Sequence, residues 1–325
     1  MLAGWALKVL MAALCLRAEA ALPAQTEPFP SRPVRVIVPF PTLSRVDLVM
    51  RVINQRLSET MGQPVVIDNR PGASGAIGTD LVARSAPDGH TLLATTLPLV
   101  VNPSLLGNLQ HDVLRDFAPV SLLATAPFVL AVYPALPVSS VREFIAYARV
   151  RPGELNYASA GNGSNAHIAA ELFKNLARLD IMHVPYKAGG PAFAALLGGE
   201  TQVSFIGVVA AAQHVKTGRL RALGITANRR SALLPQVPAI AESGLPGYEF
   251  TSWYGVLVRR ATRADHVVAL NGYFRNVLQA PDIAERFSHE GVEIVAGTPE
   301  AFGRHLRAEL ARWARVVKEG GLRAE

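Results

Sequence analysis

Residues 155–176 read LNYASAGNGSNAHIAAELFKNL, and this stretch decides the fold class. Its first residues, Leu155–Ala158, form a short, largely apolar segment of the kind that makes a buried strand. A glycine-rich turn follows at 159–165, and from Ala166 to Leu176 the apolar residues have helical spacing. A strand, a short turn and a helix form the unit from which α/β proteins with parallel strands are built.

The same alternation recurs along the chain. Strands are predicted at 34–38, 65–67, 91–95, 129–133, 155–158, 181–184, 202–206 and 223–226. Helices are predicted at 48–58, 76–84, 141–149, 166–176, 265–278, 281–289 and 299–318. Ser140 and Glu143 form a capping box at the start of the third of these helices. We expect an α/β fold with mostly parallel sheets, whose ligands bind beyond the carboxyl ends of the strands.

Composition indicates a folded protein with a large core and gives no sign of a nucleic-acid partner. The chain has 325 residues, of which 50% are hydrophobic and 18% charged, which is enough for a large core and about two domains. The net charge is +7, but the basic residues are scattered and form no nucleic-acid motif. This balance suits a small anionic ligand or an acidic surface partner, and ordinary solubilising charge explains it at least as well.

The first residues predict export. Val9–Leu16 is an apolar run ended by Arg17, and the small residues Ala18 and Ala20 follow. This pattern predicts a signal peptide over residues 1–20, the alternative being an N-terminal helix that is kept. Cys15, the single cysteine, would be lost with it.

The glycine-rich turn is a candidate anion site. Glycines let the backbone approach a ligand closely, and the free amides and dipole of a helix start favour negative charge. Four neutral donors stand in the turn: Ser159, Asn162, Ser164 and Asn165. A carboxylate or phosphate fits such a cradle, and a plain strand–helix turn with a Ser or Asn cap fits equally well.

Catalytic and metal sites are not indicated. His167 and Glu171 stand four residues apart on one helix, which could ligate a metal, but no third ligand follows at a suitable spacing. Ser164 does not lie in the Gly-x-Ser-x-Gly pattern of a nucleophile elbow. We therefore expect no catalytic residue, no metal and no cofactor.

Ordered motifs then place the chain in a family. They are SRPVRVIVPFP at 31–41, DNRPGASG at 68–75, APDGHTL at 86–92, NPSL at 102–105, DFAPV at 116–120, LNYASAGNGS at 155–164, HVPYK at 183–187 and LPGY at 245–248. Over residues 30–318 the chain resembles the Bug (TctC-like) extracytoplasmic solute receptors, which serve tripartite tricarboxylate transporters. The resemblance implies a two-lobed, type II-like periplasmic binding protein fold in which each lobe has a mixed, mostly parallel sheet flanked by helices. Two crossings would divide the chain into lobe 1, residues 30–127 and 253–325, and lobe 2, residues 128–252.

The resemblance also implies a function. The protein would work in the periplasm as a monomer, capture a small carboxylate (an organic acid or amino acid) in an interlobe cleft, and deliver it to the membrane subunits of a transporter. A carboxylate-handling enzyme and a ligand sensor for a signalling partner are the alternatives. The expected ligand-binding residues are Phe40, Thr42, Ser44, Asp47, Thr95, Thr96, Ser159, Asn162, Gly163, Ser164, His167, Gly189 and Gly207.

Three segments depart from the family pattern. The glycine pair expected after Pro41 is absent, Leu97-Pro98 replaces a small pair, and Ile206-Gly207 replaces a common Asp. Asp47 matches the family, and either a ligand amino group or a helix N-cap would explain it. Arg45 either offers a cation to a second carboxylate or is a solvated loop arginine, and we favour the solvated interpretation. The identity of the acid therefore stays open.

Overall fold

The computed structural model describes residues 28–320, so the predicted signal peptide, residues 1–20, lies outside the described part. Within it, a ten-stranded sheet has the order β2-β1-β3-β9-β4-β7-β5-β6, and β8 and β10 also pair with β4. The sheet is mixed and helices cover it, which confirms the predicted α/β class. No helix among these residues has the length and apolar character needed to cross a membrane.

The elements have the following bounds. The strands are β1 (Val34–Val38), β2 (Val65–Asn69), β3 (Thr91–Thr96), β4 (Phe117–Val132), β5 (Asn156–Ser159), β6 (Met182–Pro185), β7 (Val203–Gly207), β8 (Arg221–Ile225), β9 (Thr251–Arg259) and β10 (Glu293–Ile294). The helices are α2 (Arg45–Met61), α3 (Ala76–Ala83), α4 (Pro98–Leu105), α5 (Val113–Asp116), α6 (Val141–Arg149), α7 (Asn165–Ala177), α8 (Gly189–Gly198), α9 (Val208–Lys216), α10 (Ala264–Leu278), α11 (Pro281–His289) and α12 (Pro299–Gly320), with a 3-10 turn η1 (Ala73–Gly75).

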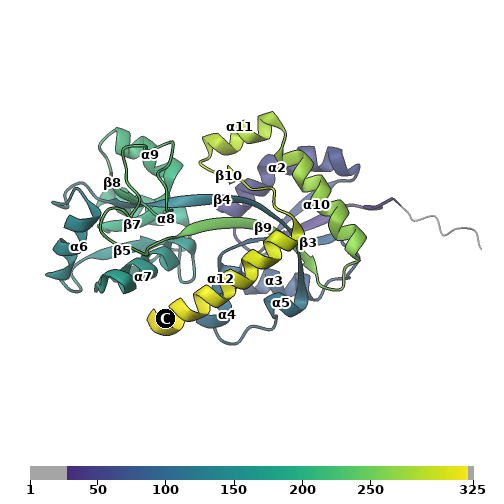
Figure 1. Ribbon diagram of the computed structural model, residues 1–325, viewed down its shortest axis with the longest axis horizontal. Helices are drawn as coiled ribbons and strands as arrows, with labels where there is room; N and C mark the ends of the chain where they lie inside the picture. Colours follow the sequence, from purple (N-terminus) through teal and green to yellow (C-terminus); the bar gives the residue numbers. More distant parts are fainter. Residues whose placement is uncertain (1–27, 321–325) are drawn as a thin grey trace, which may run out of the picture.

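The long strand β4 divides the sheet into two groups of strands. From Phe117 to Pro127 it pairs with β9, and from Phe128 to Val132 it pairs with β7 and β8. The first group contains β1, β2, β3, β9 and β10, and the second contains β5, β6, β7 and β8. The two groups lie side by side, joined by β4 and β9, with α12 lying across them (Figure 1). The lobe boundaries themselves stay a prediction.

The strand register brings the carboxyl ends of the parallel strands of both groups close to each other. β1 is parallel to β2 and β3, and β5 is parallel to β6 and β7, whereas β4 and β9 are antiparallel to their neighbours. Thr96, at the end of β3, pairs with Tyr254, which in turn pairs with Ala124 of β4. Gly207, at the end of β7, pairs with Phe128, four residues along β4. The loops that leave the parallel strands of both groups therefore converge where β4 changes partners, as ligand-binding loops do in open α/β sheets.

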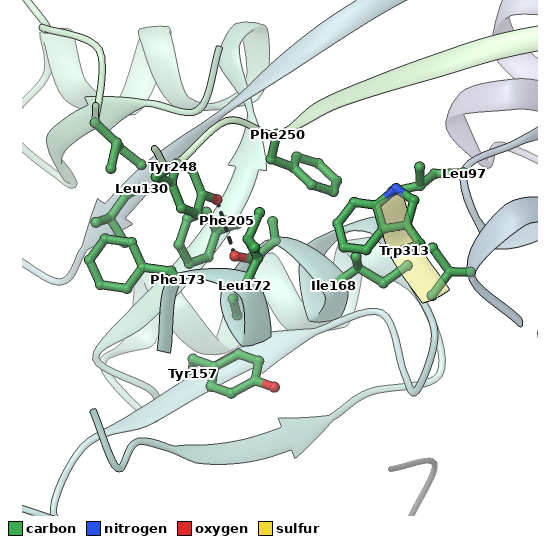
Figure 2. Packing of buried hydrophobic residues seen from close by; sticks show 14 of the residues in the cluster. Leu97, Leu130, Tyr157, Ile168, Leu172, Phe173, Phe205, Tyr248, Phe250 and Trp313 are labelled. Atoms are coloured by element: carbon green, nitrogen blue, oxygen red, sulfur yellow. Dashed lines mark hydrogen bonds between the residues drawn. The ribbon is translucent and has the colours of Figure 1, made fainter. Parts of the chain in front are cut away.

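One apolar cluster crosses from one group to the other. It contains Leu97 of the first group, Phe173 and Phe205 of the second, and Trp313 of α12. Trp313 lies between Phe250, Ile168 and Leu97 (Figure 2), and its ring centroid is 6.3 Å from that of Phe250. The Trp313 indole donates a hydrogen bond of 3.0 Å to Glu309, so its buried N–H is satisfied. The far end of α12 thus packs against the second group as well as the first.

Candidate functional site

Polar loops of the two strand groups meet at a place that we call the junction: residues 44–45, 96, 159–165, 207 and 252. The side-chain amide of Asn165, the first residue of α7, donates to the Ser252 hydroxyl over 2.7 Å. The Ser252 hydroxyl is in turn 3.2 Å from that of Thr96. The first turn of α7 is therefore fixed directly to β9 and β3 of the other group.

A second set of contacts closes the junction from the side of η1 and α4. The Ser74 hydroxyl donates to the Asn162 carbonyl oxygen over 3.0 Å, and the Asn102 amide donates to the Ser74 carbonyl oxygen over 2.9 Å. Gly163 has a φ of +72°, and a Cβ there would lie 3.2 Å from Asn102 Oδ1 and 3.3 Å from Ser74 Oγ. The two groups are therefore in close contact at the glycine-rich turn.

Within that turn, several polar groups already have partners. Ser164 is the N-cap of α7, and its hydroxyl accepts from the His167 amide over 3.3 Å. The Gly163 amide donates to His167 Nδ1, and the Gly161 amide donates to Ser159 Oγ. The amides that remain available are those at the start of α7, Asn165 and Ala166, which have no intrahelical acceptor. An anion would therefore meet the helix start rather than the whole turn.

A layer of histidines lies behind the turn. His183 Nε2 is 2.6 Å from Ser159 Oγ, and the His167 and His183 rings are 4.5 Å apart. Burial first, and then the neighbouring His167, lowers the pKa of His183 to about 4. These residues border a cavity of about 320 Å³ on the far side of the turn, with Glu171 and Lys174.

The carboxylate of Glu171, which lies four residues from His167 on α7, already has two donors. Glu171 accepts from the Tyr157 hydroxyl over 2.7 Å and from Lys174 over 2.6 Å. Within residues 28–320, no three His, Cys, Asp or Glu side chains gather as metal ligands.

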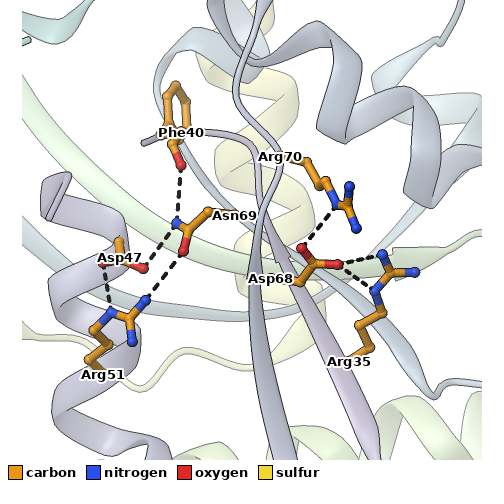
Figure 3. A network of polar contacts seen from close by, with 7 residues as sticks. All are labelled: Arg35, Phe40, Asp47, Arg51, Asp68, Asn69 and Arg70. Carbon is orange, nitrogen blue, oxygen red and sulfur yellow. Dashed lines mark hydrogen bonds and ion pairs between the residues drawn. The ribbon is translucent and has the colours of Figure 1, made fainter. Parts of the chain in front are cut away.

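The loop after β1 is held by a buried carboxylate. Asp47 is fully buried, and its carboxylate accepts from the Leu43 amide over 2.8 Å. It also accepts from Arg51 Nε over 2.8 Å and from the Asn69 side-chain amide over 3.0 Å (Figure 3). Burial acts to raise the pKa of Asp47, but these donors outweigh it and hold the pKa below its ordinary value. Ser44, not Asp47, is the N-cap residue of α2. The bonds of Asp47 explain its position without a ligand, since they fix Leu43 at a φ of +63°.

Arg45 is a junction residue and not a solvated loop arginine. Its side chain is only 28% exposed, and Nη1 donates to Glu290 Oε2 over 3.1 Å and to the Glu290 carbonyl oxygen over 3.2 Å. Nη2 lies 2.7 Å from the place where a Cβ on Gly207 would stand, so the guanidinium reaches across to the second group. The interpretation that we favoured from the sequence, a solvated loop arginine, is therefore wrong. The sequence could not indicate these contacts, because Glu290 and Gly207 lie far from Arg45 in the chain.

Three buried polar atoms at or beside the junction lack partners. Ser44 Oγ, Asn102 Oδ1 and Asn165 Oδ1 have no hydrogen-bond partner in the part of the chain that the structure describes. Leaving such a group unpaired costs about 1–3 kcal/mol, so native proteins rarely keep one without a role. The Ser44 hydroxyl can donate to an anion. The two amide oxygens can accept from a ligand hydroxyl, an ammonium group or water.

The structure brings together only some of the predicted ligand-binding residues. Ser44, Thr96, Ser159, Asn162, Gly163, Ser164 and Gly207 lie at the junction. Thr42 and Gly189 are exposed, and the ring of Phe40 lies against Gly75. Thr95 precedes Thr96 in β3, so its side chain points to the other face of the sheet. His167 holds the turn from behind.

Sequence reasoning did not select Ser74, Asn102 or Ser252 for the site. Ser74 and Asn102 stand in the quoted motifs DNRPGASG and NPSL, and Ser252 is at the predicted second crossing. Their place in these motifs and at the crossing was the only sign of a role in the sequence. Their contacts with the glycine-rich turn and the start of α7 become visible only in the structure, where the two groups lie together.

Comparisons with known proteins give a consistent result. The family model described as "Tripartite tricarboxylate transporter family receptor" matches residues 49–322. Protein BugT of Bordetella pertussis strain Tohama I is 39% identical over 303 residues, which is 93% of each chain. The structure of R. palustris Rpa4515 with adipate is 37% identical, with a TM-score of 0.83 over 90% of this chain and 98% of that one. MatC (Rpa3494) of Rhodopseudomonas palustris with bound malate is 32% identical, with a TM-score of 0.81 over 89% of this chain and 100% of that one.

Proposed function

The chain belongs to the tripartite tricarboxylate transporter receptor family, and from that premise we propose that it binds a small carboxylate at the junction of its two strand groups. It is a solute receptor of the TctC/Bug type. The observation that carries the proposal is the set of unpartnered buried atoms, Ser44 Oγ, Asn102 Oδ1 and Asn165 Oδ1, beside the free first turn of α7.

The electrostatics of the junction suit an anion. α7 is a helix of 13 residues that begins at Asn165, so the positive end of its dipole lies there. The backbone amides of its first turn have no acceptor within the helix and can donate to an anion. The Arg45 guanidinium adds a positive charge at the start of α2. The carboxylate of Asp47, in the first turn of α2, is already bound by three donors of its own strand group. A carboxylate ligand would therefore meet hydrogen-bond donors at the junction and no unpaired negative charge from Asp47.

Solved relatives support the ligand class. Rpa4515 was solved with adipate and MatC with malate, and both cover about nine-tenths of this chain. We extend carboxylate binding to this protein, with no chemical change to the ligand. We further propose that it acts in the periplasm as a monomer after removal of residues 1–20, and that ligand-dependent closure of the two groups is read by the membrane subunits of a tripartite transporter.

The test is calorimetry on the mature protein with succinate, malate, adipate and butyrate, using wild type and Asn165→Asp. The substitution puts a carboxylate at the start of α7, where the helix dipole favours it, so the fold should be kept. The same charge would repel a bound carboxylate, and we expect at least about a tenfold loss of affinity.

Asn108→Asp is the matched control, because it adds the same charge at an exposed residue in the loop after α4. It should bind like wild type. A wild-type protein that binds none of the four acids, or an Asn165→Asp variant that binds them undiminished, would contradict the proposed site.

A further inference from the structure

Arg45 is held in place with part of its guanidinium still available. Glu290 accepts from Nη1 through both Oε2 and its carbonyl oxygen. In the described chain the other donors of this guanidinium, Nε and Nη2, have no hydrogen-bond acceptor. Because an arginine carries five donors in a rigid plane, fixing one nitrogen orients the rest. The Glu290 side chain is 50% exposed, so solvent screens its charge and the free edge of Arg45 keeps its attraction for an anion.

The absence of a side chain at Gly207 makes room for the Arg45 guanidinium. A Cβ at position 207 would stand 2.7 Å from Arg45 Nη2, which is closer than real Cβ atoms come to any neighbour. Every other residue at the end of β7 would therefore push the guanidinium aside. Arg45 and Gly207 come from different strand groups, so the fit of this pair exists only when the two groups are together.

Arg45 and the first turn of α7 lie at two ends of one short stretch of β9. Ser252 and Tyr254 are two residues apart on the same face of the strand, a step of about 7 Å. Asn165 of α7 is bonded to Ser252 at one end. At the other end the Arg45 charge acts on the buried Tyr254 hydroxyl and opposes part of the rise that burial causes in the Tyr254 pKa.

We propose that Arg45 binds the second carboxylate of a dicarboxylate whose first carboxylate lies at the start of α7, so that this receptor selects dicarboxylates over monocarboxylates of equal length. Ser252 and Tyr254 place the two anion-binding groups at neighbouring positions along β9, so one small acid with a carboxylate at each end suits both. This inference rests on the proposed function, and it adds a specificity-determining residue to the same site.

The experiment compares acids of equal length in the mature protein: succinate with butyrate, and adipate with hexanoate. By calorimetry, wild type should bind the better dicarboxylate about 10- to 100-fold more tightly than its monocarboxylate partner. Arg45→Gln keeps a polar side chain but removes the charge. It should lose about 10- to 100-fold of the dicarboxylate affinity and change monocarboxylate affinity less than about threefold.

Two further variants keep the test sharp. Gly207→Ala retains Arg45 but displaces its guanidinium, and it should reproduce the selective loss for dicarboxylates. Arg56→Gln is the matched control on the same helix, because Arg56 is exposed and pairs with Asp282 away from the junction. It should leave all four affinities unchanged, and circular dichroism should show that every variant is folded.

The outcomes separate the two proposals. A wild-type protein that binds succinate and butyrate with equal affinity would contradict the proposed role of Arg45, and so would an Arg45→Gln variant with lower affinity for both kinds of acid alike. Either result would leave the proposed carboxylate site intact. If wild type binds none of the four acids, the proposed function fails with it.

Discussion

The side-chain amide of Asn165 donates a 2.7 Å hydrogen bond to the Ser252 hydroxyl, and this bond ties the start of α7 to the start of β9. The two residues are 87 positions apart in the chain. The Asn165 amide oxygen is left without a partner among residues 28–320. The bond therefore orients a polar atom that is free to meet a ligand.

Ser252→Ala should weaken both the fold and ligand binding. It leaves the Asn165 amide without its acceptor, at a cost of about 1–3 kcal/mol in the free energy of unfolding. Because Asn165 is then no longer fixed, carboxylate affinity should fall about tenfold in calorimetry. Ser121→Ala is the control, since Ser121 is equally buried and donates to the Gly297 carbonyl oxygen. It should lower stability alone, and an equal affinity loss in both variants would contradict the role of Ser252.

Gly163→Ala should loosen the contact between the two strand groups at the glycine-rich turn. The new Cβ would stand 3.2 Å from Asn102 Oδ1, in addition to the strain of a positive φ. Gly218→Ala is a close match, because Gly218 has a φ of +71° with nothing within 4 Å of the added Cβ. Both variants should lose about 1–2 kcal/mol by urea unfolding. Only Gly163→Ala should also lose carboxylate affinity, and similar binding by the two variants would show that contact at the turn is unimportant.

Stability should fall as the pH is lowered from about 6.5 to about 4, in part because of His183. Its pKa is about 4 in the folded protein, against 6.5 for an ordinary histidine, so in this window the unfolded chain takes up a proton there and the folded protein does not. The contribution is therefore present above pH 6.5, decreases toward pH 4, and changes no further below that.

His183→Gln should flatten this slope by about 1–3 kcal/mol in urea unfolding between pH 7 and pH 4. Parallel pH profiles for wild type and His183→Gln would contradict the assignment.

Asp47→Asn should destabilise the protein by about 2–4 kcal/mol, because it removes the charge that Arg51 pairs with and one acceptor of a fully satisfied buried group. The lowered pKa of Asp47 means that its stabilisation is present above its ordinary value of 3.8 and is lost only as the pH falls below that. Asp282→Asn, at a half-exposed pair with Arg56, should cost less than about 1 kcal/mol. Similar losses in thermal unfolding of the two variants would show that Asp47 does not hold its loop.

Helices that are marked by capping residues and by helical spacing of apolar residues could be predicted from the sequence. The helix predicted at 281–289 is α11 without change of bounds, and that at 299–318 is α12 extended to Gly320. The capping box also forms, since Ser140 accepts from the Glu143 amide. Such signals are local, because capping and helical spacing involve residues three or four apart.

The central antiparallel strands could not be predicted as readily. β4 runs from Phe117 to Val132, but the strand predicted there covers only residues 129–133, because Pro119 and Pro127 are typical strand breakers. In the structure the register shifts just after Pro119, and Pro127 stands where the partner of β4 changes. β9 is buried on both faces from Ser252 to Val258, so it has no polar–apolar alternation to find.

The site could be predicted in part. The start of α7 follows from the glycine-rich turn, because strand, turn and helix are consecutive in sequence. The partners of Arg45 could not be predicted, since Gly207 and Glu290 come from elements whose approach depends on the register of β4 and β9. Long-range contacts of single side chains leave no periodic signal in the sequence.

The apolar cluster around Trp313 joins the interiors of the two strand groups. Residues of both strand groups and of α12 share that interior, so a fragment cut at either crossing would expose part of it to water. The chain therefore cannot be split into two self-sufficient pieces, although its ligand site lies between two groups of strands. The two groups are held together by apolar packing around Trp313 and by polar contacts of Arg45 and Asn165. We expect the polar contacts to change more readily than the apolar packing when a ligand binds.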